Sequence, residues 1–276
     1  MADFNQKLIC LITDFGLKGQ HYIASMKGVI LKINSNIRII DITHHITPYS
    51  IIEASYVLRT TYKYFPEGTV FIIVVDPGVG SPREILMLMT ASNHYFIGPN
   101  NGVFSYISHS DILNCIEIQN NEFFNIPTSK TFHGRDIMAP VGAHLISGVP
   151  INKFGPNFDL NNLKESPLVY NIDIEKKKLR CSIQYIDSFG NGITNIAIVK
   201  NKIRNTELNI NENTKISVDI RGKVYEGFFT SHFSSVPIET ILFLVGSTGF
   251  LEISINQGNA SQKLGFNIGE IITLKL

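Results

Sequence analysis

The chain has 276 residues, and its 24 lysines and arginines nearly balance its 23 aspartates and glutamates, for a formal net charge of +1. Proteins that bind nucleic-acid backbones carry a basic surplus, so this balance argues against a general nucleic-acid partner. A hydrophobic fraction of 44% can build a sizeable core and argues against a disordered chain. No stretch approaches the roughly 18 consecutive apolar residues of a membrane-spanning helix. The first residues also lack the pattern of a signal peptide, so we expect a cytoplasmic protein with no membrane partner.

The first half of the sequence alternates between two kinds of hydrophobic pattern. Short apolar or alternating runs predict strands at 8–13, 38–42, 69–75, 85–90 and 94–97. Apolar residues at helical spacing, or helix-start signals, predict helices within 22–33, 50–62 and 132–146. Strands that alternate with helices are typical of parallel βαβ units. We therefore predict a layered α/β domain over residues 1–160.

The pattern changes after about residue 150. Turn-forming and polar residues predict a linker over 161–178. Short strands with frequent turns follow, at 180–186, 192–198, 215–220, 224–229, 241–245, 250–255 and 271–274. Such a pattern is typical of a small antiparallel sheet or barrel, which we predict for residues 179–276.

The three cysteines, Cys10, Cys115 and Cys181, are too few and too far apart for a disulfide framework or a thiolate metal site. Neither the pair His44 and His45 nor His133 belongs to an HExxH-type array, so we expect no metal. No GxSxG elbow is present, which argues against a serine hydrolase.

Two acidic residues follow predicted strands. Asp14 comes directly after the first strand, and Asp76 directly after the apolar strand at 69–75. In open α/β sheets ligands bind outside the carboxyl ends of the strands, and an acid there often accepts hydrogen bonds from ribose hydroxyls. Neither GxGxxG nor GxxxxGK[ST] is present, so a nucleoside ligand would lack a polyphosphate tail. The alternative is that each aspartate only caps its turn.

Two dense polar clusters accompany these acids. The loop from Asp76 to Arg83 contains two glycines and two prolines, which favour a shaped turn that brings Arg83 back to the carboxylate. The stretch TFHGRD places His133 at a predicted helix start, where it can hydrogen-bond or carry a proton. A loop-stapling ion pair and a structural histidine are the corresponding alternatives. In the second half, Phe189 and Phe250 stand beside turns where they could sandwich a flat base, although hairpin formation alone explains these turns.

Eight stretches together resemble one family. They are TDFG at 13–16, MKGVI at 26–30, FPEGTVF at 65–71, VDPGVGSPR at 75–83, GPNNGVF at 98–104, TFHGRDIMAP at 131–140, DSFGNGITNI at 187–196 and LEISINQGNA at 251–260. In order and over nearly the whole chain, they resemble the S-adenosyl-L-methionine (SAM) hydroxide adenosyltransferases, the adenosine-forming relatives of the fluorinases and chlorinases. The resemblance implies a Rossmann-like three-layer N-terminal domain, an antiparallel β-barrel-like C-terminal domain, and a homotrimer with its site between subunits.

The resemblance also assigns site residues. The family's catalytic Asp–Arg–His triad falls on Asp76, Arg83 and His133. The implied substrate-binding residues are Asp14 for the ribose, with Asp187, Phe189, Asn191, Ser247, Glu252 and the loop ending at Ala260 for the methionine and the adenosine. Thr248 stands where the fluorinase has an arginine near the methionine carboxylate.

The implied reaction is hydrolysis of SAM to adenosine and L-methionine, with SAM as substrate and no cofactor. The halogenases carry an aromatic residue in place of Asp76 and a tyrosine in place of His133, and the fluorinase has a halide-binding serine in place of Gly134. The sequence therefore resembles the water-using branch. The alternatives are halide-dependent cleavage of SAM and a trimer that binds SAM or adenosine without turnover.

Overall fold

The computed structural model describes residues 7–276, which divide between Ser166 and Pro167 into two compact units. The N-terminal unit is built on a six-stranded sheet with the strand order β2-β1-β3-β5-β4-β6. The strands are β1 (Leu8–Thr13), β2 (Arg38–Thr43), β3 (Val70–Val74), β4 (Ile85–Thr90), β5 (Tyr95–Pro99) and β6 (Ile112–Glu117). Strands β1 and β3, which pair with a neighbour on each side, are buried at every residue, as their uninterrupted apolar sequences predict.

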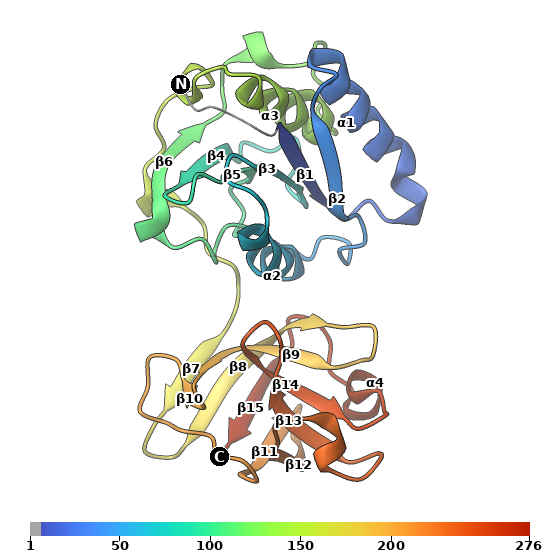
Figure 1. Cartoon of the computed structure of the whole chain (residues 1–276), viewed down its shortest axis with the longest axis vertical. Helices are drawn as coiled ribbons and strands as arrows, with labels where there is room; N and C mark the ends of the chain where they lie inside the picture. Colours follow the sequence, from blue (N-terminus) through green and yellow to red (C-terminus); the bar gives the residue numbers. More distant parts are fainter. Residues whose placement is uncertain (1–6) are drawn as a thin grey trace. The chain divides into compact units, whose positions relative to one another are not determined.

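Helices cover both faces of this sheet (Figure 1). Helices α1 (Gln20–Ile33) and α3 (Ala139–Ile146) share one hydrophobic core, to which Met26 and Val141 belong. Helix α2 (Ile51–Thr61) packs on the other face, where Leu58 belongs to a second core. The side chain of Ser50 caps α2 by accepting a hydrogen bond from the backbone N–H of Glu53.

The sheet differs from the expected parallel arrangement on one side. Strands β2, β1, β3 and β5 run parallel, but β4 is antiparallel to both β5 and β6. The reason is a tight turn after Thr90, which returns the chain directly into β5 without a crossover helix. Strand β6 was not predicted, because the polar Asn114 interrupts its apolar run. In the structure its Leu113 side chain is exposed.

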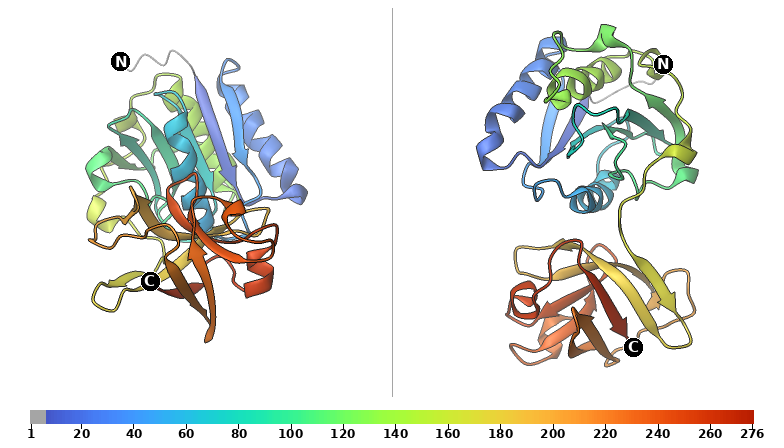
Figure 2. Two further views of the ribbon diagram at one scale, coloured as in Figure 1. Left: turned by 60° about the horizontal axis from the view of Figure 1, so that its bottom comes forward. Right: turned by 180° about the vertical axis from the view of Figure 1, so that it is seen from behind.

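The C-terminal unit contains a closed β-barrel (Figure 2). Its strands are β8 (Lys178–Ile186), β9 (Gly192–Val199), β11 (Lys215–Ile220), β12 (Lys223–Phe229), β13 (Ile241–Val245), β14 (Phe250–Ile255) and β15 (Ile271–Lys275). Pairing runs β9-β14-β13-β12-β11-β15-β8, and β8 pairs again with β9, which closes the ring. Closure leaves no free edge among these seven strands, so the small unit encloses its own core.

Three features of this unit differ from the sequence-based expectation. Strands β12 and β13 pair in parallel, so the barrel is not wholly antiparallel. A short helix, α4 (Ala260–Leu264), follows β14 and is capped by the Asn259 side chain. Strand β7 (Tyr170–Asp173) lies inside the segment expected as a linker and pairs with β8, while the two-residue strand β10 (Lys202–Ile203) pairs with β9.

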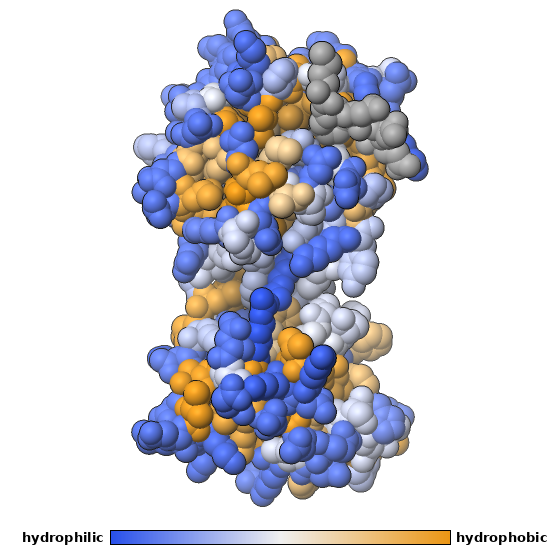
Figure 3. Space-filling model, turned by 60° about the vertical axis from the view of Figure 1, so that its left-hand side comes forward, coloured by the Kyte–Doolittle hydropathy of each residue, from blue (hydrophilic) through white to orange (hydrophobic). Residues whose placement is uncertain are grey.

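Hydrophobic side chains also reach the surface of the N-terminal unit on the side of β6 (Figure 3). Leu113, on this strand, is 65% exposed and lines a shallow hollow with Phe158 and Leu160. Within residues 7–276, no helix is both long enough and apolar enough to cross a membrane.

Candidate active site

The carboxyl ends of β1 and β3 form one wall of a hollow in the N-terminal unit. The two strands pair in parallel with Thr13 opposite Val74, so the residues that follow them emerge at the same edge of the sheet. Asp14 and Asp76 both line the resulting hollow of about 590 Å³, as the sequence predicted from their positions at strand ends. His133 lines it from the start of the segment that leads into α3.

Asp76 and Arg83 form the expected ion pair. Arg83 Nε lies 2.8 Å from Asp76 Oδ1 and 2.9 Å from Oδ2, and Arg83 Nη2 donates a further short hydrogen bond to Oδ2. The two side chains are only 4% and 7% exposed, so water screens the pair weakly. The loop between them contains Gly80, whose φ is +80°. A Cβ atom at this position would come within 2.5 Å of the carbonyl oxygen of Lys130. Glycine is therefore required at this turn.

Arg83 also contacts His133. Its Nη2 lies 3.0 Å from Nδ1 of the imidazole. A guanidinium can only donate, so Nδ1 must accept and the proton of the neutral ring must sit on Nε2. Burial lowers the pKa of His133 below its usual value, and the charge of Arg83 lowers it further. The histidine is therefore a neutral group with its Nε2–H free to donate.

The second carboxylate at this edge is held by backbone. Asp14 Oδ2 accepts a hydrogen bond of 2.8 Å from the backbone N–H of Tyr49. Burial raises the pKa of Asp14 and the charge of Asp76 raises it further, against the lowering effect of the backbone donors. Tyr49 itself lines the hollow with a positive φ of 68°, a conformation that bulky residues rarely adopt. The sequence analysis did not single out Tyr49, and the Pro48 before it was its only signal.

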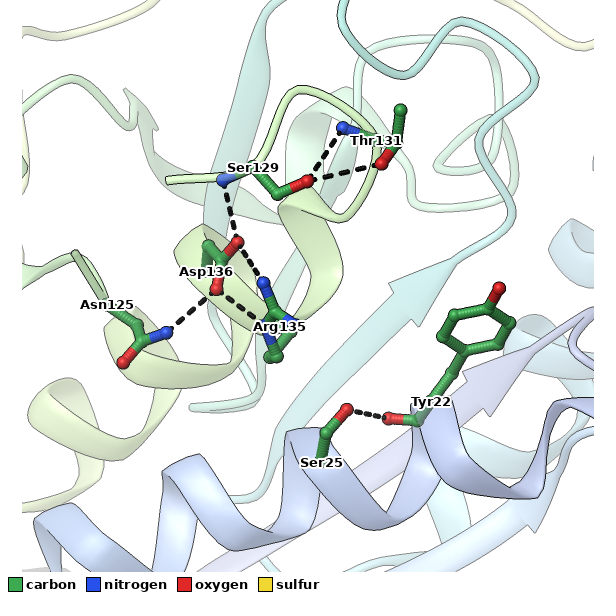
Figure 4. A network of polar contacts seen from close by, with 7 residues as sticks. All are labelled: Tyr22, Ser25, Asn125, Ser129, Thr131, Arg135 and Asp136. Atoms are coloured by element: carbon green, nitrogen blue, oxygen red, sulfur yellow. Dashed lines mark hydrogen bonds and ion pairs between the residues drawn. The ribbon is translucent and has the colours of Figure 1, made fainter. Parts of the chain in front are cut away.

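A buried carboxylate stabilises the segment that carries His133 (Figure 4). Asp136 is fully buried and accepts hydrogen bonds from Asn125 Nδ2, from the backbone N–H of Ser129, and from Nε and Nη2 of Arg135. Burial alone would raise the pKa of Asp136, but these donors outweigh burial and lower it. The network ties the loop before His133 to the turn after it, so the imidazole stands on a fixed backbone.

That turn is a π-helix over Gly134–Met138, where the sequence predicted an ordinary helix start. Turns of this kind often mark functional sites in helices. At Gly134 a Cβ would come within 2.9 Å of Cγ1 of Val74, so the absence of a side chain lets the turn pack directly on β3. The guanidinium of Arg135 lies 5.0 Å from the centre of the Phe132 ring, and both residues line the hollow.

The C-terminal unit has a separate hollow of about 580 Å³. Phe189 and Asn191 line it from the turn between β8 and β9, and residues 255–259 line it from the segment after β14. The suggestion that Phe250 stacks on a base is wrong, because its side chain is only 1% exposed and does not line this hollow. Phe233, which the sequence analysis missed, is the second aromatic residue of this hollow.

Asp187 organises the turn that carries Phe189 and Asn191. Its Oδ1 accepts from the backbone N–H groups of Phe189 at 3.0 Å and Asn191 at 2.9 Å, and its Oδ2 accepts from Asn191 Nδ2 at 2.8 Å. Burial, with a further contribution from the charge of Asp187, raises the pKa of Glu252 to about 7. Two predicted acids of this unit thus interact electrostatically.

The remaining predicted residues lie nearby in the chain but do not line this hollow. Ser247 is exposed in the turn between β13 and β14, and Ala260 is the fully buried first residue of α4. In residues 7–276, no group of three or more histidine, cysteine, aspartate or glutamate side chains is arranged to hold a metal ion.

Known proteins resemble both units. The sequence profile of the SAM hydroxide adenosyltransferase N-terminal domain matches residues 9–155, and that of the C-terminal domain matches residues 181–273. A protein of Methanocaldococcus jannaschii named (R)-S-adenosyl-L-methionine hydrolase is 36% identical, over 96% of this chain and 94% of its own length. A protein of the same name from Thermus thermophilus is 29% identical, over 96% of this chain and 98% of its own length.

A more distant relative and a solved structure are also similar to nearly the whole chain. A fluorinase of Nocardia brasiliensis is 22% identical over 98% of this chain and 97% of its own length. The crystal structure of an uncharacterized conserved protein from Thermotoga maritima has 34% sequence identity and a TM-score of 0.84, and it covers 97% of this chain and 100% of its own. The two profiles together span most of the sequence, and the chain belongs to the SAM hydroxide adenosyltransferase family.

Proposed function

We propose that the protein is an enzyme that hydrolyses SAM to adenosine and L-methionine by attack of water or hydroxide on C5′. The observation that carries this proposal is the placement of Arg83 against both Asp76 and His133, beside a hollow that Asp14 also lines. The names of the full-length relatives support SAM as the substrate, and we extend their (R) designation to the sulfonium epimer used here.

The difficult part of this reaction is activation of the nucleophile. Attack forms a bond between the water oxygen and C5′ and breaks the C5′–S bond, whose electron pair returns to sulfur. The leaving group is the neutral thioether of methionine, so it needs no general acid. Water has a pKa near 15.7 in bulk and attacks saturated carbon poorly. The site must therefore position one water and stabilise hydroxide character on it.

The three side chains suit this task in different ways. His133 carries its ring proton on Nε2, so it donates a hydrogen bond that positions the attacking oxygen and stabilises the hydroxide character which this oxygen gains as its proton leaves. Asp76 accepts a hydrogen bond from the same water and takes its proton as the C–O bond forms. Arg83 fixes both groups: it orients the carboxylate through two nitrogens and sets the tautomer of the imidazole through one.

The substrate would be held by residues of both units. Asp14 accepts hydrogen bonds from the ribose hydroxyls, and Phe189 stacks on the adenine, which the loop from Asn256 to Ala260 reads through its backbone. Asp187, Asn191, Ser247 and Glu252 hold the methionine part. The two negative charges of Asp14 and Asp76 also attract the sulfonium cation.

We further propose that the active enzyme is a homotrimer, with each site formed by the N-terminal unit of one subunit and the C-terminal unit of the next. The two units would be a Rossmann-like three-layer domain and a barrel domain. In support, the proposed substrate residues come from both units, and each unit has a hollow of its own. The exposed apolar side chains around Leu113 are of the kind that subunit contacts bury.

Incubation of the purified protein with SAM tests the proposal. Adenosine and methionine should accumulate in equal amounts, at a rate that does not depend on added chloride or fluoride, and Asp76→Ala serves as the matched control. Formation of a 5′-halogenated adenosine would instead identify a halogenase. Binding of SAM without any turnover would identify a binding protein.

A further inference from the structure

The turn that presents Asp14 is held by one neighbouring segment, residues 44–50. The backbone N–H of Gly16 donates to the carbonyl oxygen of His44 at 2.7 Å, and that of Ile46 donates to the carbonyl oxygen of Thr13 at 3.4 Å. Together with the bond from Tyr49 to the Asp14 carboxylate, these contacts place the segment against the turn on both sides.

A side-chain contact adds to them. His44 Nδ1 lies 3.0 Å from Oγ1 of Thr13, and the same hydroxyl accepts a hydrogen bond of 3.3 Å from the backbone N–H of Phe15. The Thr13 hydroxyl therefore connects the imidazole to the residue after Asp14. Thr13 is fully buried, His44 is 8% exposed, and neither lines the hollow, so neither reaches a ligand there.

On its far side the imidazole faces a carboxylate. His44 Nε2 lies 3.0 Å from Asp41 Oδ1, and Lys27 of α1 donates to Asp41 Oδ2 at 2.5 Å. The contacts run in one line from α1 through β2 to the end of β1. They couple the position of the Asp14 turn to the framework of the sheet.

The turn has a conformation that needs such support. Gly16 has φ of 63° and ψ of −173°, a combination that is essentially restricted to glycine. Tyr49, the donor to Asp14, has a positive φ as well. Unfavourable backbone conformations persist only where surrounding contacts determine them. The side-chain contacts of Thr13 with His44 and with the backbone of Phe15 lie buried directly beside this turn.

We propose that His44 is a positioning residue which, through the hydroxyl of Thr13, holds the Asp14 carboxylate where it binds the hydroxyl pair of the ligand's ribose. The proposal rests on the function proposed above for Asp14. It assigns to a histidine outside the hollow a part in substrate affinity, with no contact to the substrate and no part in the bond-breaking step.

The test measures adenosine binding by calorimetry, together with the KM and kcat for SAM, in the full-length protein. Thr13→Val keeps the shape of the side chain and removes the hydroxyl. It should weaken adenosine binding and raise KM by about tenfold, the equivalent of one lost hydrogen bond, and leave kcat within about twofold. Thr13→Ser restores the hydroxyl and should behave like the wild type.

Two substitutions of His44 separate its two contacts. Asparagine places a polar atom near the position of Nδ1, so His44→Asn should retain most of the affinity. Glutamine places one near Nε2 and loses the contact to Thr13, so His44→Gln should lose as much as Thr13→Val. His44→Asn and His44→Gln also test the proposal if Thr13→Val does not fold.

The decisive comparison repeats Thr13→Val in an Asp14→Asn background. If the hydroxyl acts through the carboxylate, its removal should cost less than about twofold there. An equal loss in both backgrounds, or no loss in either, would overturn the inference. Asp14→Asn alone separates the two proposals: wild-type affinity in this variant contradicts the role of Asp14 itself. Lost affinity in Asp14→Asn with none lost in Thr13→Val contradicts only the role of His44.

Discussion

Arg83 Nη2 lies 3.0 Å from His133 Nδ1, and this contact determines which end of the imidazole can act on a substrate. A guanidinium never accepts a hydrogen bond, so the neutral ring carries its proton on Nε2, the nitrogen that does not contact Arg83. His133 then cannot take a proton from the attacking water while it remains neutral. That part falls to Asp76, whose Oδ1 accepts one hydrogen bond from Arg83 and retains a second lone pair.

Asp76→Asn should remove the proton acceptor and keep the shape of the side chain. We expect adenosine, which carries no sulfonium charge, to bind nearly as in the wild type, and hydrolysis of SAM to fall by roughly 10²–10⁴-fold, the scale of one positioned acid–base group. Single-turnover kinetics with SAM, together with adenosine binding by calorimetry, measures the two effects separately. Near-wild-type turnover would reduce the Asp76–Arg83 pair to a structural loop contact.

The protonation of His133 gives a second prediction. Burial and Arg83 both lower its pKa, so the ring should stay neutral as the pH falls through 6.5, with its proton on Nε2. In Arg83→Ala the pKa of His133 should rise, because a neighbouring positive charge is gone. Nitrogen-15 NMR of the histidine side chains reports both the tautomer and the titration, and the exposed His45 serves as the reference. A proton on Nδ1 in the wild type would contradict the assignment.

The proposed interface site predicts complementation between inactive subunits. Asp76→Ala removes the N-terminal half of each site and Asp187→Ala the C-terminal half, so each homotrimer should be inactive. Trimers that contain both kinds of subunit should recover part of the activity, because some of their sites contain both aspartates. Activity is measured after the two variants are unfolded and refolded together. Verified mixed trimers without any activity would indicate a site formed within one chain.

Glu252 predicts how stability depends on pH. Its pKa is about 7 in the folded protein against 4.5 for the free side chain. Between these values the unfolded chain has released the proton and the folded protein retains it, so the free energy of unfolding falls as the pH rises through this window. Glu252→Gln removes this loss and should be the more stable protein above pH 7, by about 1–2 kcal/mol. Urea unfolding at pH 5 and pH 8 measures the difference, which should be absent for Glu175→Gln on an exposed turn.

The sequence predicted the strands with uninterrupted or alternating apolar residues, including β1, β3 and all seven barrel strands. It also placed Asp14 and Asp76 at one sheet edge, because parallel strands end together. It missed β6, whose residues meet solvent on one side, and it placed β4 correctly but missed its antiparallel direction, which depends on turn geometry. The positive φ of Tyr49 and the π-helix after His133 are set by tertiary contacts that no local pattern records.

The roles of aromatic residues were harder to predict than those of charged ones. Phe189 and Phe250 both stand next to turns in the sequence, but Phe250 is buried whereas Phe189 is exposed. Phe233, 44 positions from Phe189 in the chain, shares its hollow instead. A carboxylate near an arginine has few stable arrangements, whereas a phenylalanine packs equally well in a core or a binding site.

The central claim is that water supplies the oxygen that replaces sulfur on C5′, and turnover of SAM in water enriched in oxygen-18 tests it most directly. Mass spectrometry of the products should show adenosine with one heavy oxygen and methionine with none. The bond that breaks joins sulfur to C5′, and the new oxygen is attached to C5′, which belongs to the adenosine product. Asp76→Asn should give the same labelling at a much lower rate. Adenosine without the heavy oxygen, or SAM that remains intact in the presence of the wild-type protein, would contradict the account.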